Sequence, residues 1–211
     1  MFQDRQDAGR KLGELLKHKL KNDDHIILGL PRGGVVVAEE VAKTLHAPLD
    51  LLCPRKLGAP LNPELAIGAV GPSGTLFLFK DLIERLHVSQ DYLSKKQSEE
   101  TQEAKRRMIV FRPHKSPLSL KGKTAVIVDD GLATGATMRV AILEARQSHA
   151  RKVVMAIPVA PRDTFEELKH LADESYCLEI PQDFWAVGQF YSDFEQVSDE
   201  EVLNIMKRPV C

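Results

Sequence analysis

Short apolar runs alternate along the chain with segments in which apolar residues recur at helical spacing. The apolar runs predict buried strands, and the segments between them predict helices. The predicted strands cover residues 25–30, 48–53, 125–130, 153–159 and 175–180. The predicted helices include residues 2–20, 35–47 and 138–150. Because apolar strands joined by helical crossovers are typical of parallel sheets, we expect an α/β fold with a mainly parallel central sheet and helices on both faces.

Residues 57–112 interrupt this alternation. Within them, residues 65–79 form two apolar stretches separated by Gly-Pro-Ser-Gly, which predicts a β-hairpin outside the parallel sheet. Residues 81–110 predict one long helix, whose dense charge indicates a solvated face. We interpret this segment as an insertion, a lid, a dimer arm or both, within a single domain of residues 1–211, and we expect a homodimer.

Composition and charge narrow the class of protein. The chain has 211 residues, of which 43% are hydrophobic and 28% charged, so it can bury one substantial core. Its 29 basic and 30 acidic residues nearly cancel, which argues against a nucleic-acid-binding protein. No run approaches the ~20 apolar residues that a membrane span requires, so we expect a cytoplasmic protein without membrane contact. Cys53, Cys177 and Cys211 lack metal-ligand spacing and are interpreted as reduced thiols.

The most informative segment is AVIVDDGLATGAT, residues 125–137. Ligands of open parallel sheets bind beyond the carboxyl ends of the strands, where this segment places Asp129 and Asp130. Gly131 and Gly135 allow a tight loop whose backbone N–H groups converge on an anion at the start of the next helix. The helix dipole adds to that attraction.

The acid pair and the anion-binding loop must serve different parts of a ligand. Two carboxylates would repel a phosphate, so their partner is a sugar diol, a metal ion, or both. One ligand that carries a phosphate and a diol fits the whole segment. The alternative is an ordinary strand-to-helix turn with an aspartate N-cap, although such a turn requires neither the second acid nor Thr134 and Thr137. A Walker A loop and a dinucleotide fingerprint are excluded by the glycine spacing and the missing Gly-Lys-Ser/Thr.

This segment resembles the diphosphate-ribose signature of the type I phosphoribosyltransferases, in which apolar residues precede two acids, a short spacer and Thr-Gly-x-Thr. The resemblance implies that Asp129 and Asp130 bind the hydroxyls of a ribose. It assigns the 5-phosphate of that ribose to Ala133, Thr134, Gly135, Ala136 and Thr137.

Two further loops resemble pyrophosphate-binding segments of the same family. The PRGG loop implies that Arg32, Gly33 and Gly34 contact pyrophosphate, through a guanidinium and backbone amides. Taken alone, it would also suit a routine turn before a helix. Arg55 and Lys56 resemble the Arg-Lys pair that follows the second strand in some members, which makes them the candidate catalytic cations; surface decoration is the alternative.

The carboxyl-terminal segment, residues 180–211, resembles the hood of hypoxanthine and xanthine-guanine enzymes. By that match Trp185 stacks on the acceptor, and Ala186 and Val187 offer it backbone groups; the alternative is that Trp185 fills the core. Asp193 lies where the family often has an acid that contacts the metal–pyrophosphate complex.

The resemblance implies a phosphoribosyltransferase that moves the ribose 5-phosphate of phosphoribosyl pyrophosphate to a nitrogen acceptor, a nucleobase-like small molecule, and releases pyrophosphate. It also implies Mg²⁺, held mainly by substrate oxygens and water. Ala133 stands where purine-salvage enzymes have a third acid, and Arg162 is the only basic residue near the position of their purine-reading lysine, so the sequence does not name the acceptor. A non-catalytic sensor of phosphoribosyl pyrophosphate or a nucleotide is the alternative. A receiver or phosphatase domain is disfavoured because no matching lysine or DxD spacing is present.

Overall fold

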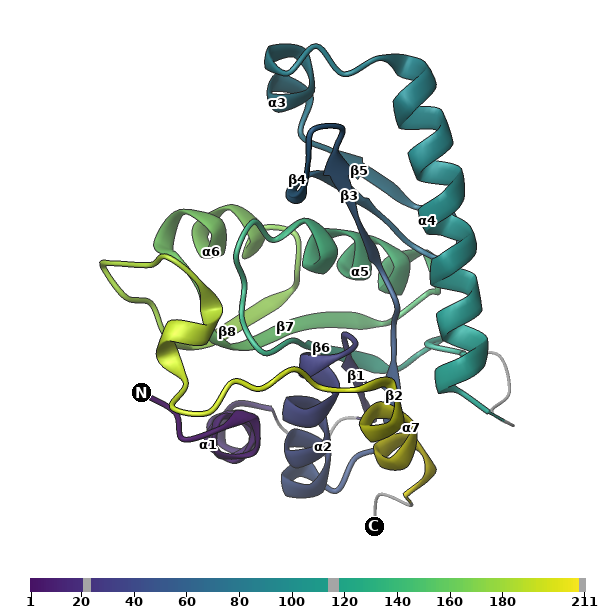
Figure 1. Ribbon diagram of the computed structural model, residues 1–211. Coiled ribbons are helices and arrows are strands. Elements are labelled where there is room, and N and C mark those ends of the chain that lie inside the picture. Colours follow the sequence, from purple (N-terminus) through teal and green to yellow (C-terminus); the bar gives the residue numbers. More distant parts are fainter. Residues whose placement is uncertain (21–23, 114–117, 209–211) are drawn as a thin grey trace.

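A five-stranded parallel sheet forms the centre of the protein (Figure 1). The structure, a computed structural model, describes residues 1–20, 24–113 and 118–208. In spatial order the strands are β2 (Leu49–Leu51), β1 (His25–Gly29), β6 (Thr124–Val128), β7 (Lys152–Val159) and β8 (Glu174–Glu179). Every pair of neighbouring strands runs parallel. The predicted fold class is confirmed, and each strand lies within two residues of the apolar run that predicted it.

Helices cover both faces of the sheet (Figure 1). One face carries α1 (Arg5–Lys19), α2 (Gly33–Leu45) and α7 (Asp199–Lys207); the other carries α5 (Ala136–Gln147) and α6 (Arg162–Leu168). Side chains of a strand alternate between the two faces. In β6, Val126 and Val128 therefore pack with α1 and α2, whereas Ala125 and Ile127 pack with α5. This double coverage explains why β6 is buried along its whole length and apolar over residues 125–128.

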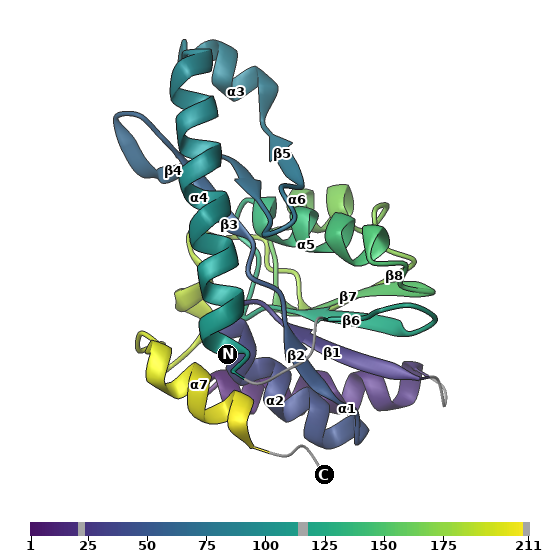
Figure 2. The same ribbon diagram turned by 90° about the vertical axis from the view of Figure 1, so that its right-hand side faces the viewer.

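The insertion forms a second, antiparallel sheet and two helices beside the central sheet (Figure 2). Its strands are β3 (Arg55–Ala59), β4 (Asn62–Val70) and β5 (Leu76–Leu78), in that order across the sheet. Its helices are α3 (Lys80–Arg85) and α4 (Gln90–Phe111). The predicted β-hairpin is confirmed as β4 and β5, which pair antiparallel outside the parallel sheet.

Two predictions about the insertion are wrong. The single helix expected over residues 81–110 is broken between α3 and α4. His87 has a left-handed backbone with φ 50°, and the Ser89 side chain accepts a hydrogen bond from the Tyr92 amide, which starts α4 as a new helix. Arg55 and Lys56, expected in a loop, begin strand β3, because pairing with β4 supplies the backbone hydrogen bonds that the local sequence does not suggest.

Polar contacts fix the insertion to the central domain at two points. At the hairpin turn, the Glu144 carboxylate on α5 accepts hydrogen bonds from the amide and the hydroxyl of Ser73, at 2.9 and 2.6 Å. At the end of α4, Arg112 donates two hydrogen bonds to the buried Asp50 carboxylate of β2, at 2.7 and 3.0 Å. These contacts hold β3 and β4 against α5.

None of the helices within residues 1–20, 24–113 and 118–208 is both long and apolar enough to span a membrane. Cys53 and Cys177 are free thiols, as predicted, while Cys211 lies outside the described residues. Burial raises the pKa of both described thiols to about 12, so neither has the thiolate character of a reactive cysteine.

Candidate active site

The acid pair lies at the carboxyl end of β6, in the middle of the parallel sheet. The Asp130 amide donates a hydrogen bond to Asp129 Oδ1 at 2.9 Å, so the two residues form one tight turn. Burial raises the pKa of Asp129 well above its ordinary value, and the neighbouring Asp130 carboxylate raises it further. Burial also raises the pKa of Asp130, against the opposing attraction of Arg5. Ionisation of both acids is therefore unfavourable in the free protein, and a ligand with hydrogen-bond donors would stabilise the charged pair.

The PRGG loop lies directly against this pair. A Cβ atom on Gly34 would be 2.8 Å from the Cα of Asp129, and one on Gly33 would overlap the Asp130 carboxylate. Only glycine permits this approach, which brings the start of α2 beside the acids. The Pro31–Arg32 peptide bond is cis, and the Arg32 guanidinium lies 3.6 Å from Asp199 at the start of α7. The structure thus joins two motifs that are about a hundred residues apart in the chain.

The loop that follows the acids forms the floor of a cavity of about 180 Å³. Gly135 has φ 71°, a left-handed conformation that glycine adopts without strain, and α5 begins at the next residue. The first turn of α5 contains no acidic side chain, so its free amides and its dipole favour an anion. The Thr164 hydroxyl fixes the loop by donating to the Ala133 carbonyl at 3.0 Å. Lys56 and Val187 complete the lining of the cavity.

Strand geometry separates the two candidate catalytic cations. Successive side chains of a strand point to opposite faces, and in β3 only Lys56 faces the cavity. Its Nζ donates to the Glu64 carbonyl and carboxylate, at 3.0 and 3.1 Å. Arg55 points to α4, where its Nε donates to Glu100 at 2.9 Å. Lys56, rather than Arg55, is therefore placed to meet a ligand in this cavity.

Of the three hood residues predicted to bind the acceptor, only Val187 lies at the cavity. Val187 lines the cavity and contacts the backbone at Gly131. Trp185 is 89% exposed, which excludes the alternative that it fills the core. The amides of Trp185 and Ala186 donate to the Gln189 side chain at 2.8 and 3.1 Å. Those two residues lie outside the cavity, and their amides are occupied in this conformation.

Asp193 is exposed, and its carboxylate accepts a hydrogen bond from the Glu195 amide at 3.1 Å. In the part of the chain that the structure describes, no three His, Cys, Asp or Glu side chains converge as metal ligands would. That part of the chain therefore offers no preformed cage for a cation, and the assignment of Asp193 to a metal stays a prediction.

Arg5, Tyr191 and Phe194 are site residues that sequence reasoning missed. Arg5 Nε donates to Asp130 Oδ2 at 2.7 Å, and the Tyr191 hydroxyl donates to the Asp130 carbonyl at 2.6 Å. Phe194 lies under the Arg5 guanidinium, 3.8 Å from the ring centroid. The one local signal was Arg5 itself, a cation in the first turn of a helix, where the dipole disfavours it.

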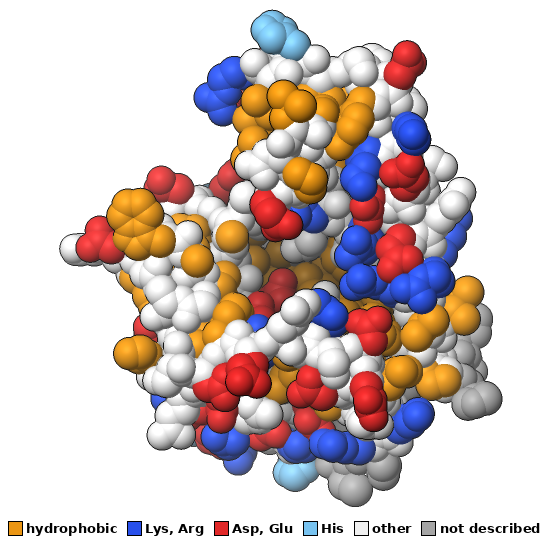
Figure 3. All heavy atoms as spheres, in the orientation of Figure 1, with side chains coloured by type: hydrophobic (Ala, Val, Ile, Leu, Met, Phe, Trp, Pro, Cys, Tyr) orange, Lys and Arg blue, Asp and Glu red, His pale blue; other side chains and the backbone are white. Residues whose placement is uncertain are grey.

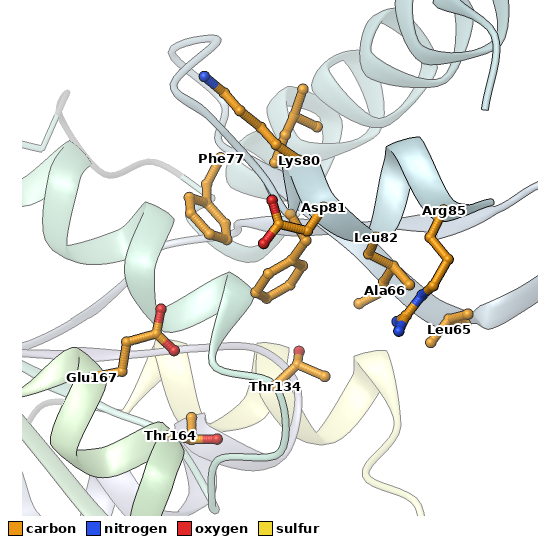
Figure 4. Close-up of a pocket in the computed structure, with 12 residues that line it drawn as sticks. Leu65, Ala66, Phe77, Lys80, Asp81, Leu82, Arg85, Thr134, Thr164 and Glu167 are labelled. Carbon is orange, nitrogen blue, oxygen red and sulfur yellow. The ribbon is translucent and has the colours of Figure 1, made fainter. Parts of the chain in front are cut away.

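A larger cavity of about 840 Å³ opens on the other side of the loop (Figure 4). Phe77, Asp81 and Leu82 approach it from the insertion, and Thr164 and Glu167 approach it from α6. Thr134 lines both cavities. The space-filling view shows the molecule hollowed between the insertion and the central domain, with basic side chains along one side of the hollow (Figure 3).

Comparisons with known proteins point in one direction. Residues 51–195 match the family model described as phosphoribosyl transferase domain, a range that includes the acid pair and the loop but begins after PRGG. Two Mycobacterium tuberculosis proteins, from strains CDC 1551 and H37Rv, are provisionally named phosphoribosyl transferases and are 46% identical over 208 residues. That alignment covers 99% of this chain but 47% of each relative, so the chain spans about half of their length.

The crystal structure of TT1426 from Thermus thermophilus shares the whole architecture. It is 43% identical in sequence and superimposes with a TM-score of 0.79, and the match covers 97% of both chains. The insertion and the carboxyl-terminal segment are therefore parts of a fold that this chain shares with that protein.

Proposed function

The chain belongs to the family of phosphoribosyl transferase domains, and we propose that it transfers the ribose 5-phosphate of phosphoribosyl pyrophosphate to a nitrogen acceptor. The observation that supports this most strongly is the convergence of separate segments on one site. The loop of residues 131–137, Lys56 and Val187 line one cavity of about 180 Å³, and the acid pair and the PRGG glycines adjoin that loop.

Each part of the substrate then has a matching group. The 5-phosphate lies in the cavity, where the amides of residues 133–137 and the dipole of α5 bind it. The ribose hydroxyls donate to the Asp129 and Asp130 carboxylates, which relieves the repulsion within the pair. The pyrophosphate lies beside Gly33 and Gly34, within reach of Arg32.

The reaction is a displacement at the anomeric carbon of the ribose. The bond from this carbon to pyrophosphate breaks with its electron pair on the leaving oxygen, and the nitrogen lone pair of the acceptor forms the new bond. The acceptor N–H proton passes to solvent. Because the transition state develops positive charge on the sugar, positioning and neutralisation of the leaving group supply most of the catalysis. Lys56 and Arg32 supply protein charge for that purpose.

Mg²⁺ fits the donor set only as a substrate-bound ion. Described residues form no cage of three ligands, and such an ion commonly keeps several waters and binds through substrate phosphates. Its contribution would be to neutralise charge on the pyrophosphate. Asp193 is the protein carboxylate we assign to contact this complex.

The acceptor is proposed to be a nucleobase-like compound that enters between the hood and the insertion. Trp185 is exposed at the hood and free to stack on a flat ring after a small rearrangement. Ala133, at the exposed edge of the loop, leaves the acceptor nitrogen without an acidic partner from the spacer. An acceptor whose nitrogen is already nucleophilic suits such a site better than one that must be deprotonated.

The test is release of pyrophosphate from phosphoribosyl pyrophosphate and Mg²⁺ across a panel of purines, pyrimidines, orotate and small amines. We expect acceptor-dependent release with at least one member of the panel, and loss of that release in Lys56→Ala. Binding of phosphoribosyl pyrophosphate without release for any acceptor would favour the regulatory sensor instead.

A further inference from the structure

Arg5 connects four segments of the protein around the acid pair. From the first residue of α1, its Nε donates to Asp130 at 2.7 Å and its Nη1 donates to the Glu195 carbonyl at 2.8 Å. Its guanidinium lies on the Phe194 ring, 3.8 Å from the centroid. The Gly33 backbone is close enough that an added Cβ would be 2.6 Å from Arg5 Nε. The ribose acids, the PRGG loop and the carboxyl-terminal segment therefore all meet at this side chain.

This arrangement is not explained by the needs of α1. A cation in the first turn of a helix opposes the helix dipole, and burial of a guanidinium carries a desolvation penalty. Even so, the Arg5 side chain is only 10% exposed and that of Asp130 is 17% exposed. Arg5 Nε holds Oδ2 of Asp130, while the Asp130 amide donates to Asp129 Oδ1. Local rules that a sequence breaks in this way are commonly broken at functional sites.

We infer that Arg5 is a positioning residue that holds the Asp130 carboxylate in the orientation that binds the ribose hydroxyls, an inference that rests on the proposed function. The ion pair occupies Oδ2 of Asp130, so this carboxylate cannot rotate freely. Its other oxygen accepts from the sugar. Arg5 contacts Asp130, Glu195 and Phe194 and lies close to Gly33, and of these only Asp130 is assigned to the ribose, so the effect of Arg5 on ribose binding passes through Asp130.

The experiment compares two ligands by calorimetry at pH 7. Ribose 5-phosphate requires the acid pair and the phosphate loop, whereas inorganic phosphate requires only the loop. Arg5→Gln removes the ion pair and keeps a polar side chain. Arg5→Lys keeps the positive charge but loses the guanidinium group that bonds Asp130 and Glu195 together. Arg10→Gln is the matched control, because Arg10 lies on the same helix, is 54% exposed and is 3.9 Å from its partner Glu40.

We expect Arg5→Gln to weaken the binding of ribose 5-phosphate by about tenfold or more, as loss of a charge-assisted hydrogen bond would. The affinity for phosphate should stay within about twofold of the wild-type value. Arg5→Lys should recover part of the ribose 5-phosphate affinity, and Arg10→Gln should match the wild type with both ligands. A purely structural role for Arg5 would weaken both ligands together, which overturns the inference.

Two other results would also overturn it. If Arg5→Gln binds ribose 5-phosphate like the wild type, the inference fails while the proposed function stands. If the wild type binds ribose 5-phosphate no better than phosphate, the diol assignment and the proposed function fail as well.

Should Arg5→Gln not fold, Phe194→Leu removes the ring beneath the guanidinium and keeps the charge. This variant should weaken the binding of ribose 5-phosphate by about threefold and leave the affinity for phosphate unchanged. An unchanged affinity for ribose 5-phosphate would contradict the inference.

Discussion

Asp129→Asn should make the protein more stable and abolish its binding of the proposed substrate, phosphoribosyl pyrophosphate. The Asp129 carboxylate is buried beside that of Asp130, and both burial and this neighbour raise its pKa well above the ordinary value. Its ionised form therefore costs folding free energy at neutral pH. Asparagine is nearly the same size, can still accept the hydrogen bond from the Asp130 amide, and carries no charge.

The magnitude follows from the repulsion within the pair. Two unit charges ~4 Å apart at an effective dielectric of ~20 repel by about 4 kcal/mol. The Arg5 guanidinium, 2.7 Å from Asp130, attracts both carboxylates and offsets part of that repulsion. We expect Asp129→Asn to raise the free energy of unfolding by about 1–3 kcal/mol at pH 7. For a chain of this length each 1 kcal/mol corresponds to a melting temperature about 2–4 °C higher.

The stability difference between the wild type and Asp129→Asn should depend on pH. A carboxyl group whose pKa is higher in the folded than in the unfolded state stabilises the fold fully below its unfolded pKa. That stability is lost as the pH rises through the folded pKa. Wild-type stability should therefore decline relative to the variant from acidic to neutral pH, and the two should converge near pH 4.

Urea unfolding at several pH values measures this difference. Asp183→Asn is the control, because Asp183 is exposed and should show no such pH-dependent gain. If Asp129→Asn is less stable than the wild type at pH 7, or if its advantage does not change with pH, the repulsion assigned to the acid pair is wrong.

Four other substitutions test separate parts of the structure. Lys56→Ala should weaken the binding of phosphoribosyl pyrophosphate by about tenfold and change the melting temperature little. Arg55→Ala should mainly lower the melting temperature, because it leaves Glu100 without this partner. Calorimetry measures the first effect and thermal melts measure the second. Glu144→Ala should cost about 1–3 kcal/mol in urea unfolding, since it removes both hydrogen bonds from the hairpin turn, and a neutral result would refute the anchoring of the insertion. Trp185→Ala should leave stability unchanged, because the indole is exposed, but raise the KM of the acceptor; an unchanged KM would remove the hood from acceptor binding.

The parallel sheet and the site loop could be predicted because their signals are local. An unbroken apolar run such as residues 125–128 of β6 is buried on both faces, and this pattern is visible in a few consecutive residues. The acid pair and the glycines of the loop lie within thirteen consecutive residues, 125–137, so their chemistry could be read without any tertiary contact.

The parts that could not be predicted depend on contacts between distant residues. Arg5 and Asp130 are separated by 125 positions, and nothing near Arg5 in the sequence indicates an acidic partner. Strand β3 exists because β4 pairs with it, and that pairing turns Arg55 away from the cavity toward Glu100. The break between α3 and α4 was locally visible at Ser89, but the charge pattern across it favoured one helix.

The central claim is that the site binds phosphoribosyl pyrophosphate through the acid pair and the adjoining loop. Titration calorimetry of this compound with Mg²⁺, on the wild type and on the double variant Asp129→Asn, Asp130→Asn, tests it most directly. We predict saturable one-site binding to the wild type and no measurable binding to the folded double variant. Equal affinity of both proteins, or no binding to the wild type, would contradict the claim.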